Sequence, residues 1–216
     1  MPQLVLSPSD PSSPQTWKPT GPIPISVRSF GKFPDIACWR PGDLILVSAV
    51  KPDLIARSIR SVQIRGGYHQ DDARWEHAAV YIGAGAICEA TRQGVQPKPI
   101  YEYIGQHLIR VRRNQKLTVD EQWRVAVEAL IKQDFSYSFW SAAALLAKSR
   151  NGFWNFQRGP IKQPKRATIC SQLYADAYTK VTGQTLGNVQ SGETTPASLS
   201  SDSTLVDVQS AWLTIV

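Results

Sequence analysis

The sequence is poor in cysteine and lacks long apolar runs. Its three cysteines are Cys38, Cys88 and Cys170, and none belongs to a CxxC pair. This number and spacing argue against a disulfide scaffold and against a zinc site built from cysteines. The apolar run at residues 142–147 is far shorter than the roughly 20 residues that a membrane-spanning helix needs. We therefore expect a soluble protein that folds in a reducing compartment without a metal or other cofactor.

The first residues also lack the marks of a secretory signal, a basic region followed by a long apolar stretch. We therefore expect the protein to be cytoplasmic as synthesised. Export by a route that needs no such signal is an alternative. Delivery into another cell as an antibacterial effector is a further one, and it would imply an immunity protein as partner.

Acidic side chains are missing from one long segment. Residues 135–175 contain no Asp or Glu, although the chain as a whole has 17 of them and a net charge of +7. The basic residues in this segment are Lys148, Arg150, Arg158, Lys162, Lys165 and Arg166. This charge would favour a thiolate at Cys170 and attract an anionic substrate or surface. The alternative interpretation is that the positive charge only keeps the protein soluble. We expect no nucleic-acid partner, since zinc-finger spacing, an aromatic RNA-binding run and a recognition helix are all missing.

Proline defines the expected domain boundary. Seven of the 15 prolines lie in residues 1–24, mixed with Ser and Thr. Such composition predicts an extended segment, so we expect residues 1–35 to form a Pro/Ser-rich N-terminal extension. The remaining residues, 36–216, suit a single domain, and an apolar content of 42% is enough for a hydrophobic core.

The apolar pattern predicts an α+β fold, with a small antiparallel sheet packed against helices. Expected strands cover residues 44–47, 77–82, 86–91, 108–112 and 205–208. Expected helices run from Leu54 to the glycines at 66 and 67, from the Thr118–Glu121 capping box to about Lys132, over residues 139–148, and onward from Cys170. The second of these should bury Trp123, Val127, Leu130 and Ile131, and both Cys38 and Cys88 are expected in the core.

Cys170 is the first candidate for chemistry. The residues around it, Thr168-Ile169-Cys170-Ser171-Gln172-Leu173, are typical of a loop that turns into an amphipathic helix. A cysteine in the first helical turn faces free backbone N–H groups and the positive end of the helix dipole, which lower a thiol pKa. This position therefore predicts a nucleophile, and Ser171 next to it is a candidate for substrate binding.

His77 and Glu89 are the candidates for activating that thiol. If Gly83-Ala84-Gly85 is a three-residue turn, Ala79 pairs with Glu89, and His77 and Glu89 lie diagonally on one face of a hairpin. A base needs such an acceptor on its second ring nitrogen to fix its orientation. A turn one residue shorter would put Glu89 on the opposite face, where it would be a surface carboxylate. His69 and His107 are rival bases, and Tyr68 and Tyr81 are candidates for lining the site.

The chain also resembles a known family. The stretches that carry the resemblance are Pro41-Gly42-Asp43-Leu44-Ile45-Leu46-Val47, Glu76-His77-Ala78-Ala79-Val80-Tyr81-Ile82-Gly83, Cys88-Glu89-Ala90 and Cys170-Ser171-Gln172-Leu173. Together they are similar to the circularly permuted branch of the NlpC-type papain-like hydrolases, which includes the YiiX- and YaeF-like proteins and is related to the lecithin:retinol acyltransferase group. The resemblance implies a papain-like fold, with Cys170 as nucleophile, His77 as base and Glu89 as third member.

These observations predict a cysteine hydrolase that works by acyl transfer. The first expectation is an amidase or peptidase that acts on cell-wall peptides or similar amides. The second is a lipid-directed acyltransferase, thioesterase or phospholipase, in which Phe153, Trp154 and Phe156 within the basic segment meet an anionic membrane surface. The third is a non-catalytic binding module on the same fold.

Overall fold

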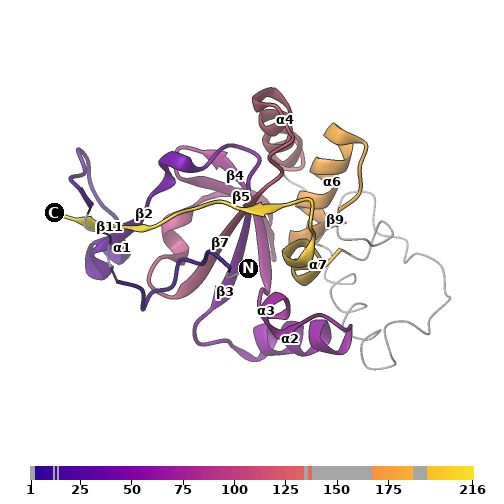
Figure 1. Ribbon diagram of the computed structural model, residues 1–216, viewed down its shortest axis with the longest axis horizontal. Coiled ribbons are helices and arrows are strands. Elements are labelled where there is room, and N and C mark those ends of the chain that lie inside the picture. Colours follow the sequence, from indigo (N-terminus) through magenta and orange to yellow (C-terminus); the bar gives the residue numbers. More distant parts are fainter. Residues whose placement is uncertain (1–2, 12, 14, 134–135, 138–166, 187–193) are drawn as a thin grey trace.

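Figure 1 shows the computed structural model, which describes residues 3–11, 13, 15–133, 136–137, 167–186 and 194–216. A six-stranded antiparallel sheet forms its centre, with the strand order β10-β7-β3-β4-β5-β6. The strands are β3 (Leu44–Ala49), β4 (His77–Gly83), β5 (Ala86–Thr91), β6 (Gly94–Pro99), β7 (His107–Arg113) and β10 (Val206–Asp207). The expected α+β class is thus confirmed.

Some helices pack against a face of the sheet, and others lie beside the ends of its strands. They are α2 (Leu54–Arg65), α3 (Gln70–Ala73), α4 (Val119–Leu130), α6 (Cys170–Thr182) and α7 (Pro196–Ser201). In Figure 1, α4 and α6 lie side by side next to the sheet, and both contact β4. Alternation along β4 explains this arrangement, because Ala78 and Val80 join one buried cluster with Val125 of α4 and Leu173 of α6. Within the described residues, no helix is long and apolar enough to cross a membrane.

The opposite face of the sheet packs against the two ends of the chain. Here Ile45, Tyr81 and Ile109 share a second buried cluster with Trp212. Trp212 begins β11 (Trp212–Ile215), which pairs with β1 (Thr16–Trp17) and β2 (Lys32–Pro34) in a small second sheet. The remaining short elements are α1 (Ile25–Phe30), the 3-10 helices η1 (Ile36–Cys38) and η2 (Ile100–Tyr103), and the parallel pair β8 (Ser136–Tyr137) and β9 (Ala167–Thr168).

The N-terminal residues that the structure describes lie against the sheet. Leu6 is buried and forms a bridge to Ile109, and Val27 is fully buried in the second cluster. Residues 16–17 and 32–34 pair with the last strand. Residues 1–35 therefore do not stand apart from the domain in the described parts. Proline-rich composition gave no indication of this packing, since the few apolar residues between the prolines carry it.

Helix α4 begins at the expected capping box but buries a different face. Thr118 and Glu121 form the reciprocal bonds, whereas Trp123 is 50% exposed and Val127, Leu130 and Ile131 are not fully buried. The buried positions are Gln122, Val125, Ala126 and Ala129. A Cβ at Gly42 would lie only 2.2 Å from the Gln122 carbonyl oxygen, so backbone meets backbone here. Small side chains permit this approach. Trp123, Val127 and Ile131 face outward, whereas Leu130 is partly buried against the core.

Other expectations for the elements have mixed outcomes. Cys88 is buried as expected, but Cys38 is exposed because it ends η1, where its thiol donates to the Gln209 carbonyl oxygen. The helix expected over residues 139–148 and the basic segment up to residue 166 lie outside the described residues. After α6, Thr195 caps the helix α7 with a capping box that the sequence analysis did not identify.

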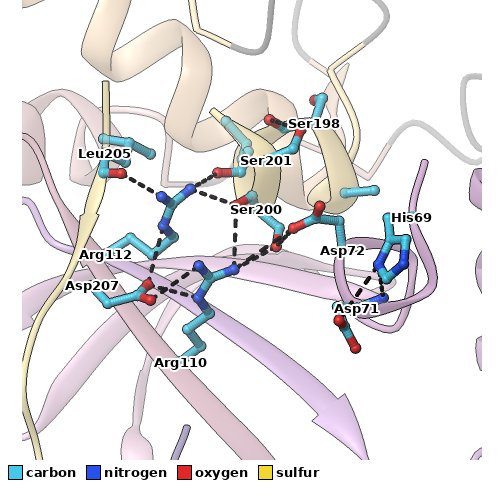
Figure 2. Close-up of polar contacts among 12 residues, drawn as sticks. His69, Asp71, Asp72, Arg110, Arg112, Ser198, Ser200, Ser201, Leu205 and Asp207 are labelled. Carbon is cyan, nitrogen blue, oxygen red and sulfur yellow. Dashed lines mark hydrogen bonds and ion pairs between the residues drawn. The ribbon is translucent and has the colours of Figure 1, made fainter. Parts of the chain in front are cut away.

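Two buried arginines of β7 fasten the C-terminal residues to the sheet. Figure 2 shows the Arg110 and Arg112 guanidinium groups between α7 and Asp207 of β10. Asp207 accepts from Arg110 Nε at 2.7 Å and from Arg110 Nη2 at 3.1 Å. Arg112 Nη1 donates to the Leu199 and Ser200 carbonyl oxygens at 2.8 and 2.6 Å. These bonds replace water around two nearly fully buried charges.

We therefore expect Asp207→Ala to destabilise the fold strongly. The change leaves both guanidinium groups buried without their shared carboxylate, which typically costs about 3–5 kcal/mol in the free energy of unfolding. Urea unfolding followed by circular dichroism measures this. Asp120→Ala, in the exposed first turn of α4, is the matched control and should cost less than about 1 kcal/mol. Equal losses in the two variants would contradict the role given to Asp207.

Candidate functional site

Cys170 is the first residue of α6, as expected from the sequence. Cys170 is 9% exposed, so the residue is largely shielded from solvent. Burial by itself raises the pKa of the Cys170 thiol, whereas hydrogen bonds from the backbone of Ala78 and Ser171 lower it. The start of α6 and the adjacent strand β4 thus surround the sulfur with groups that favour its anion.

The β4–β5 hairpin has the expected register but a different turn. Ala79 pairs with Glu89 and Val80 with Cys88, which confirms the pairing on which the site depends. The turn consists of Ala84 and Gly85, whose φ angles of 51° and 75° are typical of a type I′ turn. A three-residue turn was therefore wrong. A bulge between Tyr81 and Gly83 places one extra residue in β4, which compensates for the turn being one residue shorter than predicted. Glu89 therefore stays on the same face of the hairpin as His77.

His77 and Glu89 meet directly. His77 Nε2 lies 2.7 Å from Glu89 Oε2, and the Glu89 side chain is fully buried. The His77 side chain is 20% exposed. Because Nε2 faces the carboxylate, the other ring nitrogen, Nδ1, is the one left to interact with the Cys170 thiol. The imidazole therefore bridges the sulfur and the carboxylate where β4 and α6 both begin.

The charges of this group reinforce one another. Burial lowers the pKa of His77, but the Cys170 thiolate and its hydrogen bond, together with Glu89, raise it to about 10. Burial raises the pKa of Cys170, and the positive charge and hydrogen bond of His77 lower it below its usual value. At neutral pH this arrangement favours a thiolate beside an imidazolium.

Glu89 has two further neighbours that the sequence analysis missed. Tyr103 Oη donates to Oε2 at 2.5 Å, and Lys98 Nζ lies 3.3 Å from Oε1. Burial raises the pKa of Glu89, but the hydrogen bond and charge of His77, then Tyr103 and Lys98, lower it to about 2. No motif marks either residue. The prolines at 97 and 99 obscured the strand β6 that carries Lys98.

The rival histidines do not bind the sulfur in the structure. His69 caps α3 through its bond to the Asp71 amide and has a 76% exposed side chain. His107 packs edge-on against Tyr103, with ring centroids 5.0 Å apart, and burial lowers its pKa. His77 is therefore the histidine that the fold brings to Cys170.

The expected substrate-binding residues are placed differently. Tyr81 lies in the second buried cluster, packs edge-on against Trp39 and accepts from the Gly85 amide, so it is a core residue. The Ser171 hydroxyl is buried and donates to the Thr194 carbonyl oxygen at 2.7 Å, so it is already engaged within the protein. The group of Ser171 that lies near the Cys170 sulfur is its backbone amide. Tyr68 lies just after α2, where its amide donates to the Gln63 carbonyl oxygen, and its role in binding stays a prediction.

The low pKa of Glu89 has a consequence for stability in acid. Its folded pKa of about 2 lies below the ordinary value of 4.5, so the carboxylate stabilises the fold above pH 4.5 and this contribution is lost as the pH falls through 2. We expect the wild-type protein to lose about 3 kcal/mol more than Glu89→Gln over this range. Urea unfolding at several pH values measures the difference. Glu102→Gln, at an exposed carboxylate near the same lysine, should behave as wild type. Parallel curves for all three proteins would contradict the ionised state of Glu89.

A metal-ligand set is not part of this arrangement. Within the part of the chain that the structure describes, no group of three or more His, Cys, Asp or Glu side chains is placed to hold a metal ion. His77 hydrogen-bonds to Glu89 and interacts with Cys170. The described site thus brings together a thiol, an imidazole and a carboxylate.

Comparison with known proteins shows the fold. No family model matches the chain, and no curated protein matches its sequence. Among solved structures, the chain is similar to the crystal structure of metalloprotein yiiX from Escherichia coli O157:H7, DUF1105. The TM-score is 0.53 at 16% sequence identity, and the match covers 78% of this chain and 96% of that chain. This likeness shows that the chain has a YiiX-like α+β fold.

Proposed function

We propose that the protein is a cysteine hydrolase that works by acyl transfer, with Cys170 as nucleophile, His77 as general base and acid, and Glu89 as the residue that orients His77. One observation carries this proposal: a line of three interacting side chains, in which the His77 imidazole interacts with the Cys170 thiol and hydrogen-bonds to the buried Glu89 carboxylate. Such a line activates a nucleophile in unrelated hydrolase folds.

The chain order supports the finer family assignment. His77 and Glu89 lie on strands that precede α6, so the base comes before the nucleophile in the sequence. This is the order of the permuted NlpC-type papain-like hydrolases that the motifs resemble. The YiiX-like fold agrees with this branch, and we propose that the chain belongs to it.

In the proposed reaction, the Cys170 thiolate attacks the carbonyl carbon of the substrate, and the carbonyl electron pair moves to oxygen. Backbone N–H groups at the start of α6, including that of Cys170, would receive this oxyanion, and one such donor is typically worth about 3 kcal/mol. The tetrahedral intermediate collapses to a thioester as the His77 imidazolium gives its proton to the leaving nitrogen or oxygen. Neutral His77 then takes a proton from water, and the resulting attack releases the acid and restores the thiolate.

Glu89 has a positioning role in these steps. Because its carboxylate is buried and accepts from Nε2, it keeps Nδ1 directed at the sulfur and stabilises the imidazolium.

We propose a small amide, such as a cell-wall peptide, as the first substrate class. An acyl lipid is the second, because the lack of acidic residues over 135–175 suits an anionic surface. Incubation with peptidoglycan peptides and, separately, with anionic phospholipid vesicles distinguishes them by the mass of the released product.

The same incubations test the covalent step. Rapid acid quenching followed by peptide mass spectrometry should find the acyl group on the Cys170 peptide and not on the peptide that carries Cys38. With a slowly hydrolysed ester as substrate, the acyl-enzyme should accumulate before the quench. Release of product without any acyl group on Cys170 in that experiment would contradict the thioester intermediate. Binding of either material without turnover would favour the binding module instead.

A further inference from the structure

The Glu89 carboxylate is held at both of its oxygens. Tyr103 Oη donates to Oε2, the same oxygen that His77 Nε2 approaches, and Lys98 Nζ lies near Oε1. The Glu89 side chain is fully buried, so bulk water does not replace either neighbour. The orientation of the carboxylate is therefore set by these three side chains.

Tyr103 is firmly placed for this contact. It ends η2, where Ile100 is fully buried and the following Ile104 is 3% exposed. Its ring packs edge-on against His107 at 5.0 Å and lies 6.1 Å from the His77 ring. Packing on both sides limits the rotamers of Tyr103, so its hydroxyl has a fixed direction.

The Tyr103 hydroxyl acts as a donor. Burial raises the pKa of Tyr103, and the charge of Glu89 and the hydrogen bond to it raise it further. The phenol therefore keeps its proton at neutral pH, which rules it out as a base or nucleophile. What it supplies is a second hydrogen bond to Oε2.

We propose that Tyr103 is a positioning residue that acts through Glu89 on His77. Its hydrogen bond holds Oε2 toward the imidazole against the pull of Lys98 on the other oxygen. Without it, the carboxylate can rotate toward Lys98, and the imidazolium is held less firmly against the Cys170 sulfur, whose pKa it lowers. This role rests on the proposed function of Cys170 and His77, and it names a fourth side chain on which that site depends.

Other charged groups must stay constant when Tyr103 is tested. The titratable side chains that face this unit are His77 on β4, Lys98 on β6, Glu102 in η2, His107 on β7 and Cys170 on α6, and Cys88 on the opposite face of β5 is also affected by the charge of Glu89. Tyr103→Phe removes one hydroxyl and leaves all of their charges and the aromatic packing in place. A change in thiol reactivity can then be assigned to the lost hydrogen bond.

The test measures the reactivity of Cys170 without a substrate. Wild type, Tyr103→Phe and Tyr101→Phe are treated with iodoacetamide from pH 4 to 8, and labelling of the Cys170 peptide is followed by mass spectrometry. In Tyr103→Phe, the acid limb of the rate profile should move to higher pH, and the rate below that limb should fall about 3- to 10-fold, as expected for one lost hydrogen bond. Tyr101→Phe, at a half-buried position in the same 3-10 helix, should follow wild type.

Two results would overturn the proposal. One is a Tyr103→Phe profile that coincides with wild type. The other is an equal change in both variants, which would indicate loosening of η2. With a substrate in hand, Tyr103→Phe should lower kcat and leave KM unchanged. Because labelling needs no turnover, the expected shift in a protein that hydrolyses nothing would contradict the proposed function while supporting the role of Tyr103.

Discussion

Replacing Cys170 with alanine is expected to abolish turnover, with a loss of about 10⁴-fold or more, as is usual when a covalent nucleophile is removed. The physical reason is that no other described side chain near His77 offers a thiolate. Cys88 is buried, and burial raises the pKa of its thiol to about 12, so it cannot substitute. The fold should survive, because alanine retains the Cβ and is a good helix former.

Cys38→Ala is the matched control for this variant. Cys38 is exposed at the surface but partly shielded, and this partial burial together with the nearby Asp35 raises the pKa of its thiol, so it is a poor nucleophile. This control should keep full activity. Steady-state rates of both variants, with unfolding curves to show that they are folded, provide the measurement. Activity of Cys170→Ala within tenfold of wild type would rule out covalent catalysis at this thiol.

Replacing His77 with glutamine is expected to have the second largest effect, a loss of about 10³-fold or more in kcat. The variant removes the general acid and the positive charge that lowers the pKa of Cys170, while the burial that raises this pKa remains. The thiol should therefore become protonated at neutral pH. It also leaves the buried Glu89 carboxylate without its imidazolium partner.

His69→Gln is the control for His77→Gln, because its side chain is 76% exposed and belongs to the cap of α3. It should retain wild-type rates. Kinetics over pH 5 to 9 would also show whether any activity of His77→Gln returns at high pH, where the thiol ionises without help. Equal activity of the two histidine variants would assign the base to another residue.

The parts of the site that local chemistry defines could be predicted from the sequence. A helix start places Cys170, and strand alternation puts His77 and Glu89 on one face once their pairing is known. The pairing itself was predicted from a turn length that the structure does not have. The predicted pairing of β4 with β5 is nevertheless right, because a bulge between Tyr81 and Gly83 compensates for the shorter turn. The residues Gly83-Ala84-Gly85 do not reveal from sequence either the bulge or the two-residue turn.

The parts that long-range packing defines could not be predicted. Lys98 and Tyr103 reach Glu89 only because β6 pairs along the whole of β5 and η2 follows it. The outer face of α4 is as apolar as its buried face, and the close approach of Gly42 decides between them. Likewise, the burial of Arg110 and Arg112 depends on residues nearly 90 positions later in the chain, which no local pattern reveals.

The most direct test of the account is the state of the Cys170 thiol in the resting protein. Alkylation by iodoacetamide at pH 5.5, read peptide by peptide, compares Cys170 with Cys38 and Cys88 in the same molecules. We expect rapid labelling of Cys170, very little at the other two, and loss of the Cys170 reaction in His77→Gln. Labelling of Cys170 that is as slow as that of Cys38 at this pH, or that is unchanged in His77→Gln, would contradict the thiolate–imidazolium pair.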